Sequence, residues 1–255
     1  MVKSADRIID ILEMLVASER PLTQTEIASQ VKIPKSSAFA LLATLEKRAY
    51  VIRSKVGYEL NLQSPIQFRI VDERVTLRQI AKPILDQVTA TTRESTFIGV
   101  LTKGYEVRYL DKSVSEQEIR YDADVTKLRP AYCTSTGQVL LAGLSDSEFE
   151  LYLKTVPREM NTENTLVSED RLRQRILDVR QYGYAKNINE RVVGASGIAV
   201  PIKNQKGSTV ASICVSAPTQ RFEKIEGELE SAIIDGGARL SDTYARLQHI
   251  IHNEK

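Results

Sequence analysis

Two cysteines and two histidines are the residues best suited to nucleophilic or metal chemistry, and their spacing favours neither. Cys133 and Cys214 lie 81 positions apart, without the short spacing of a zinc site or a disulfide framework. His249 and His252 stand among the last seven residues, where a helix end is a poor place for a proton shuttle. The sequence also lacks a phosphate loop, a dinucleotide fingerprint and a Gly-x-Ser-x-Gly elbow. It therefore predicts no catalytic site, no cofactor and no metal, although a mechanism based on a carboxylate, a lysine or a cysteine stays open.

A second group of residues has the chemistry for binding DNA. Between residues 32 and 55, six lysines and arginines stand against the single acidic residue Glu46. Positive charge concentrated in this way can neutralise phosphates and give a salt-dependent affinity for DNA. The alternative is a solvated basic face on a purely structural helical domain. The candidate DNA contacts are Thr23, Gln24, Thr25, Lys35, Ser36, Ser37, Phe39, Ala40, Arg53 and Lys55.

Residue type suggests a role for several of these candidates. Lys35 supplies a phosphate or guanine contact, and Ser36 and Ser37 reach a phosphate or a base edge. Phe39 is a large aromatic residue off the main apolar stripe. It contacts either a thymine methyl group or the first helix. Residues 23–25 lie at a predicted helix N-terminus, which favours a bound phosphate.

Three helices and a hairpin in residues 1–64 are the elements that must position these side chains. Apolar residues at helical spacing predict helices over 4–18 and 35–48, and the sequence Thr23-Gln24-Thr25-Glu26 fits a capping box at the start of a second helix. Pro34 ends that helix and lies in the first turn of the third. Residues 50–53 and 58–61 are predicted as the strands of a hairpin that includes Arg53 and Lys55. This order predicts a winged helix-turn-helix, whose third helix enters the major groove.

The rest of the chain predicts linker helices over 65–92 and an α+β domain over 93–255. Mixed strands with helices packed to one side are expected in that second domain. Strands are predicted at 95–102, 105–111, 118–125, 197–203 and 208–216, and helices at 137–144, 146–154, 168–183 and 223–248.

Composition and length agree with two domains outside a membrane. The 255 residues fit roughly two domains of about 100 to 200 residues each. No apolar stretch approaches the ~20 residues needed to cross a bilayer, and acidic residues at positions 6, 10 and 13 interrupt the place of a signal peptide. The sequence therefore predicts a cytoplasmic protein without a membrane partner.

The segment "SADRIIDILEMLVASERPLTQTEIASQVKIPKSSAFALLATLEKRAYV" resembles the N-terminal domain of the IclR (isocitrate lyase regulator) family of bacterial transcription factors. The Ser-x-x-Arg-x-x-x-Ile-Leu opening, the Pro-Lys-Ser-Ser helix start and the Leu-Leu-x-Thr-Leu-Glu-x-Arg close carry the likeness. The order of later elements is similar to the family's GAF-like effector domain. Where the family commonly has His-Arg, this chain has Phe39-Ala40, so a basic contact on the reading helix is missing and a different operator is expected.

Four later stretches are similar to the family's ligand pocket. They are "RPAYCTSTGQVLLA", "GYAKN", "GASGIAVPI" and "SICVSAP". Asn187 stands where many members have Asp, and Gly197 where many have Cys, which predicts a roomier and less acidic pocket. The resemblance implies the effector-binding residues Cys133, Thr134, Ser135, Gly137, Asn187, Gly197, Cys214 and Ser216. Structural roles are the alternative: residues 134 and 135 cap a helix, Cys214 fills the core, and Gly197 permits a strand bend.

The sequence and its resemblance to this family thus predict a ligand-responsive transcriptional regulator that represses a catabolic operon. Its partners would be double-stranded operator DNA, a small organic acid (aromatic, aliphatic or sugar-derived) and further copies of itself, as a homodimer or a dimer-of-dimers tetramer. The helix around residues 77–92 is the predicted two-state element. Two alternatives stay open: a small cytosolic enzyme with an accessory helical domain that uses Cys133 or Cys214, and an architectural DNA-binding dimer without a ligand.

Overall fold

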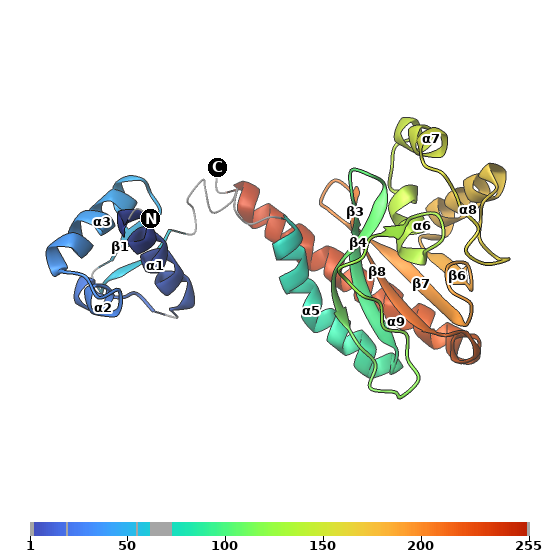
Figure 1. Ribbon diagram of the computed structural model, residues 1–255, viewed down its shortest axis with the longest axis horizontal. Helices are drawn as coiled ribbons and strands as arrows, with labels where there is room; N and C mark the ends of the chain where they lie inside the picture. Colours follow the sequence, from blue (N-terminus) through green and yellow to red (C-terminus); the bar gives the residue numbers. More distant parts are fainter. Residues whose placement is uncertain (1–2, 19, 55, 62–72, 254–255) are drawn as a thin grey trace. The chain divides into compact units, whose positions relative to one another are not determined.

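A computed structural model describes residues 3–18, 20–54, 56–61 and 73–253 (Figure 1). The chain divides into two compact units, the first within residues 1–72 and the second beginning at Glu73. Each unit has a hydrophobic core of its own. The predicted division into residues 1–64, 65–92 and 93–255 stays a prediction, although the structure groups the helix from Glu73 to Thr92 with the second unit.

The first unit is a winged helix-turn-helix, as predicted. Its helices are α1 (Lys3–Ala17), α2 (Gln24–Gln30) and α3 (Lys35–Lys47), and its antiparallel hairpin strands are β1 (Val51–Arg53) and β2 (Tyr58–Leu60). The apolar stripes of all three helices meet the hairpin in one core. Its buried side chains are Ile11, Leu15, Leu22, Ile27, Leu42, Leu45, Val51 and Tyr58.

The turn between α2 and α3 follows from two local signals. The predicted capping box is confirmed, because the Thr23 hydroxyl accepts a hydrogen bond from the Glu26 amide and the Glu26 carboxylate accepts one from the Thr23 amide at 2.7 Å. Lys32 adopts a left-handed conformation with φ of 54°. Pro34 then precedes the first residue of α3, where its fixed φ suits the start of a helix.

The second unit is built on one six-stranded sheet in which every neighbouring pair is antiparallel. The strands, in spatial order, are β5 (Arg129–Pro130), β4 (Glu106–Ser113), β3 (Ser95–Leu101), β8 (Thr209–Pro218), β7 (Ala195–Lys203) and β6 (Ala185–Ile188). The helices are α5 (Glu73–Thr92), α6 (Ser135–Ala142), α7 (Asp146–Thr155), α8 (Glu169–Tyr182) and α9 (Thr219–Asn253). The predicted α+β class is confirmed, and the arrangement is compatible with a GAF-like domain.

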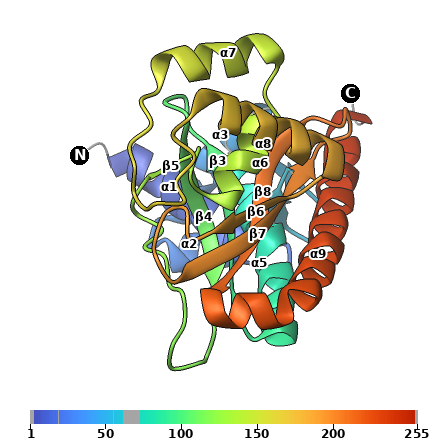
Figure 2. The ribbon, with the colours of Figure 1, turned by 90° about the vertical axis from the view of Figure 1, so that its right-hand side faces the viewer.

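Helices cover both faces of this sheet, so the expectation of helices on one side was wrong (Figures 1 and 2). Helices α5 and α9 pack on one face over Ile98, Val200 and Ile213. Helices α6, α7 and α8 pack on the other face over Phe97 and Cys214. Because neighbouring residues of a strand point to opposite faces, each central strand contributes to both cores. This explains the nearly continuous burial of β3, β7 and β8.

Two strand assignments differ from the sequence analysis. The predicted strand over 118–125 was wrong: this segment has no regular structure, and the two-residue strand β5 pairs with β4 instead. Alternation of polar and apolar residues suggested a strand with one buried face. Ile119, one of its apolar residues, is instead 74% exposed and does not pack on the core. Strand β6 was not predicted, since its four residues are too few for a clear periodicity.

Within the residues that the structure describes, no helix is both long and apolar enough to span a bilayer. The part of the predicted linker helices over residues 65–72 lies outside the described residues.

Gly137 and Gly227 form a matched pair for a test of packing. A Cβ at Gly137 would overlap the Ala131 backbone, whereas a Cβ at Gly227, which is exposed in α9, would meet nothing within 4 Å. We expect G137A to lower the free energy of unfolding by about 1–3 kcal/mol or more through overpacking. G227A should raise it by roughly 0.5–1 kcal/mol, because alanine favours helix over glycine. Urea denaturation of both variants measures this, and equal stabilities would contradict the packing at Gly137.

Candidate ligand pocket and nucleic-acid interface

Helix α3 presents a polar and aromatic face to solvent. Its residues Ala38, Leu42 and Leu45 are buried inside the first unit. On the opposite side, Phe39 is 52% exposed, so packing against the first helix does not bury it. The predicted contacts Lys35, Ser36 and Ala40 are exposed on the same helix, and Ser37 is half-buried. This surface combines a cation, hydroxyl groups and an apolar ring, which are the groups that contact phosphates and base edges.

The start of α2 is occupied more by structural contacts than the sequence suggested. The Thr23 hydroxyl accepts from the Glu26 amide and donates to the Glu26 carboxylate at 2.8 Å. Hydrogen bonds from Arg20 and Thr23 lower the pKa of Glu26 to about 2, so this helix end already holds a negative charge. The Gln24 side chain donates to the carbonyl of Lys35 at 3.0 Å and ties the two helix starts together. Thr25 is exposed, and it is the residue of this group that remains available to a phosphate.

The wing contributes one described candidate. Arg53, at the end of β1, is exposed, and its guanidinium carbon lies 5.6 Å from the centre of the Tyr58 ring. This cation–π contact holds the side chain against the hairpin. Lys55 lies outside the described residues.

The second unit contains a pocket between the start of α6, the strand ends of β6 and β7, and β4. Its empty space, counted together with the open solvent at its mouth, is about 370 Å³. It brings together six of the eight predicted effector residues: Cys133, Thr134, Ser135, Asn187, Gly197 and Ser216. Gly137 and Cys214 do not line it. Gly137 packs against the backbone of Ala131, and Cys214 is 1% exposed in the core.

The predicted alternatives hold for some of these residues. The Thr134 hydroxyl caps α6 by accepting from the Gly137 amide at 3.0 Å, so it serves the helix and also lines the pocket. A Cβ at Gly197 would lie 2.8 Å from the Ser216 hydroxyl and 3.4 Å from that of Ser135. The missing side chain therefore leaves space between two hydroxyl groups of the pocket.

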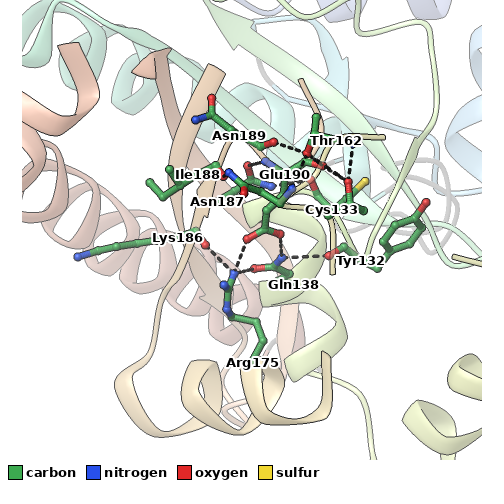
Figure 3. Close-up of polar contacts among 12 residues, drawn as sticks. Tyr132, Cys133, Gln138, Thr162, Arg175, Lys186, Asn187, Ile188, Asn189 and Glu190 are labelled. Atoms are coloured by element: carbon green, nitrogen blue, oxygen red, sulfur yellow. Dashed lines mark hydrogen bonds and ion pairs between the residues drawn. The ribbon is translucent and has the colours of Figure 1, made fainter. Parts of the chain in front are cut away.

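Asn187 and Glu190 anchor the pocket wall to α6 (Figure 3). The Asn187 amide nitrogen donates to the Cys133 carbonyl at 2.5 Å, and its oxygen accepts from the Glu190 amide at 3.2 Å. The buried Glu190 carboxylate accepts from Gln138 at 2.6 Å and pairs with Arg175 at 2.8 Å. Burial raises the pKa of Glu190, and Arg175 opposes that shift. Asn187 thus both lines the pocket and holds its wall, and sequence reasoning missed the second role.

Sequence reasoning also missed three prominent residues of the lining: Tyr109, Tyr121 and Arg191. Tyr109 comes from β4, Tyr121 from the segment wrongly predicted as a strand, and Arg191 from the turn after β6. They are up to 82 positions apart in the chain. No local pattern connects them, so only the fold could reveal their proximity.

The chemistry of the two thiols disfavours nucleophilic catalysis. Burial raises the pKa of Cys133 to about 11 and also raises that of Cys214. Both thiols are therefore protonated near neutral pH, whereas a nucleophile must be a thiolate. The described residues also contain no group of three or more His, Cys, Asp or Glu side chains that could hold a metal ion.

Two family descriptions match the chain. "Bacterial transcriptional regulator IclR C-terminal" matches residues 70–242, more than half of the chain, and "IclR helix-turn-helix domain" matches residues 4–54. The chain belongs to the IclR family. The resemblance seen in the sequence is confirmed, and with it a DNA-binding transcriptional regulator. Membership favours a regulator over the enzyme alternative.

Individual relatives agree along nearly the whole chain. The HTH-type transcriptional regulator KdgR of Escherichia coli (strain K12) is 28% identical over 240 residues, 93% of this chain and 90% of KdgR. An IclR homologue from Microbacterium sp. strain HM58-2 matches with a TM-score of 0.72 at 22% identity, covering 94% of this chain and 96% of that one. An IclR homologue from Microbacterium hydrocarbonoxydans, complexed with 4-hydroxybenzoate, matches with a TM-score of 0.62 at 23% identity, covering 96% and 99%. The two structures establish the fold.

The roles of Asn187 and Asn189 predict opposite outcomes for one chemical change. N187D replaces the donor to the Cys133 carbonyl with an acceptor, which should cost about 1–3 kcal/mol for a buried unpaired group. The side chain of Asn189 hydrogen-bonds through its oxygen, which accepts from the Gly194 amide at 2.8 Å and the Thr219 hydroxyl at 2.7 Å. N189D keeps those acceptors and should stay near wild-type stability. Thermal unfolding checks both variants, and a fully stable N187D would remove the structural role of Asn187.

Proposed function

We propose that this regulator binds operator DNA through the exposed face of α3. A small organic acid that binds in the pocket of the second unit lowers or raises the affinity for the operator. The observation that supports this most is the division of α3 into a buried apolar side and an exposed side with Lys35, Ser36 and Phe39. A homodimer or dimer-of-dimers tetramer would read a pseudo-palindromic operator in the cytoplasm. We propose repression of a catabolic operon as its role.

The chemistry of the pocket supports an acidic ligand. The hydroxyl-bearing residues Thr134, Ser135 and Ser216 line it, beside the start of α6. Oxygen atoms of a carboxylate accept hydrogen bonds from such groups. The 4-hydroxybenzoate in the Microbacterium hydrocarbonoxydans homologue is an organic acid of this kind. An effector changes DNA affinity only if it prefers one conformational state, and the proposed two-state element is the helix over residues 77–92.

Lys35 offers a direct test of the DNA interface. If its ammonium group neutralises a phosphate, K35A should weaken operator binding and reduce the slope of log K against log salt concentration by about 1. Gel shifts across a salt series, with the operator that the protein selects from genomic fragments, measure both quantities.

Lys206 provides the matched control, because it is an exposed lysine in the turn between β7 and β8 of the second unit. K206A should bind the operator like the wild type. Equal affinities for K35A and the wild type at every salt concentration would overturn the assignment of Lys35.

Phe39 allows a test at the level of one methyl group. An exposed apolar ring on the reading helix can contact the C5-methyl group of thymine. Replacement of operator thymines one at a time by deoxyuridine should weaken wild-type binding at one position and leave binding by F39A unchanged there. Fluorescence anisotropy is measured for the wild type and F39A, each with the thymine and the deoxyuridine operator. The four affinities give the interaction free energy between the ring and the methyl group. Additive effects at every thymine would show that Phe39 contacts none of them.

A further inference from the structure

The pocket contains a cation without an anionic partner. Arg191 lines it together with Tyr109 and Tyr121, and no aspartate or glutamate belongs to the lining. The Nε atom of Arg191 is buried and has no hydrogen-bond partner. Elsewhere in this unit the arginines are commonly ion-paired, and Arg175 and Arg221 pair with the buried carboxylates of Glu190 and Glu94 at 2.8 and 2.5 Å. A buried donor without an acceptor costs free energy until a ligand supplies one.

Two aromatic rings lie in the same lining. The Phe97 ring centre is 5.2 Å from that of Tyr109 and 5.9 Å from that of Tyr121, so the three rings form one cluster. Burial raises the pKa of both tyrosines, which therefore stay neutral. Neutral rings beside a guanidinium group suit a ligand with an apolar body and one acidic end.

The segment that carries Tyr121 is fixed before a ligand binds. Arg221 donates to the Ile119 carbonyl at 2.8 Å while it pairs with Glu94. Lys112 pairs with Asp122 at 2.5 Å. These two anchors hold the chain on either side of Tyr121, so little conformational entropy remains to be lost there on binding.

The turn that carries Arg191 is fixed in a comparable way. The Glu190 carbonyl accepts from the Thr165 hydroxyl at 2.6 Å, and the Glu190 carboxylate is held by Arg175 and Gln138. The guanidinium of Arg191 therefore projects from a rigid turn, and its planar donors match the two oxygens of a carboxylate.

We infer that Arg191 selects the effector by pairing with its carboxylate, and that Tyr109 and Tyr121 pack against a single ring of the same ligand. This inference rests on the proposed function and names its ligand class: a single-ring aromatic carboxylate. Arg191 is the specificity-determining residue, since a ligand without a negative charge would leave its guanidinium without an anionic partner.

The test pairs acids with their neutral amides. Purified full-length protein is titrated with benzoate, 4-hydroxybenzoate, benzamide and 4-hydroxybenzamide, and binding is followed by calorimetry and by the shift in melting temperature. We expect an acid to bind the wild type and its amide to bind at least 10-fold more weakly. R191Q should weaken binding of the acid by about 10- to 100-fold, as expected for loss of a charge-assisted hydrogen bond. R191K should recover part of that affinity.

Arg108 supplies the control variant, because it is exposed and neighbours Tyr109 on β4 but points to the opposite face. R108Q should bind the acid like the wild type. The inference is wrong if none of these acids binds, if acid and amide bind equally, if R191Q equals the wild type, or if the aliphatic diacid succinate binds more tightly. Gel shifts of the ligand-free wild type test operator binding separately, so a failure of the proposed function is seen independently.

Discussion

The second unit depends on one buried carboxylate. Glu190 is only 3% exposed, and its carboxylate connects Arg175 of α8 with Gln138 of α6. Its backbone amide donates to the side-chain oxygen of Asn187 and so ties in its own turn. Burying a charged pair is a weak source of stability, because desolvation offsets much of the attraction. Its effect here is geometric, since it sets the position of the pocket wall against the start of α6. The shape of the pocket is thus determined by residues that mostly do not line it.

Local chemistry accounts for what the sequence predicted correctly. Three signals act within a few residues and can therefore be recognised in the sequence. They are the capping box at Thr23 and Glu26, Pro34 at the start of α3, and the left-handed Gly183 after α8. The segment over 118–125 shows the limit. Its alternating pattern matches a strand, but long-range contacts from Lys112 and Arg221 hold it as an irregular segment. Periodicity reports which side chains face a surface, and it does not report whether a neighbouring strand is present to complete a ladder.

The candidate site shows the same division between local and distant information. Resemblance pointed to Thr134, Ser135, Gly197 and Ser216, and the structure brings these residues into one pocket. The resemblance could not identify Arg191, because a basic residue in a polar turn carries no local sequence signal that it lines a pocket. The resemblance also could not distinguish Cys214, which lies beneath the pocket, from Cys133, which lines it. Both are small apolar residues on buried segments. Depth below a surface is a property of tertiary packing.

The sheet offers a physical route from the pocket to the helix that follows the DNA-binding unit in the chain. On β8, Cys214 and Ser216 face the pocket side, while Ile213 and Val215 face α5 and α9. A ligand that displaces Ser216 therefore acts on a strand whose opposite face supports those helices. Helices α5 and α9 pack closely, because a Cβ at Gly236 of α9 would lie 2.8 Å from the side chain of Val88 in α5. Closely packed helices tend to shift as units instead of deforming, and this packing is the physical basis for proposing α5 as the two-state element.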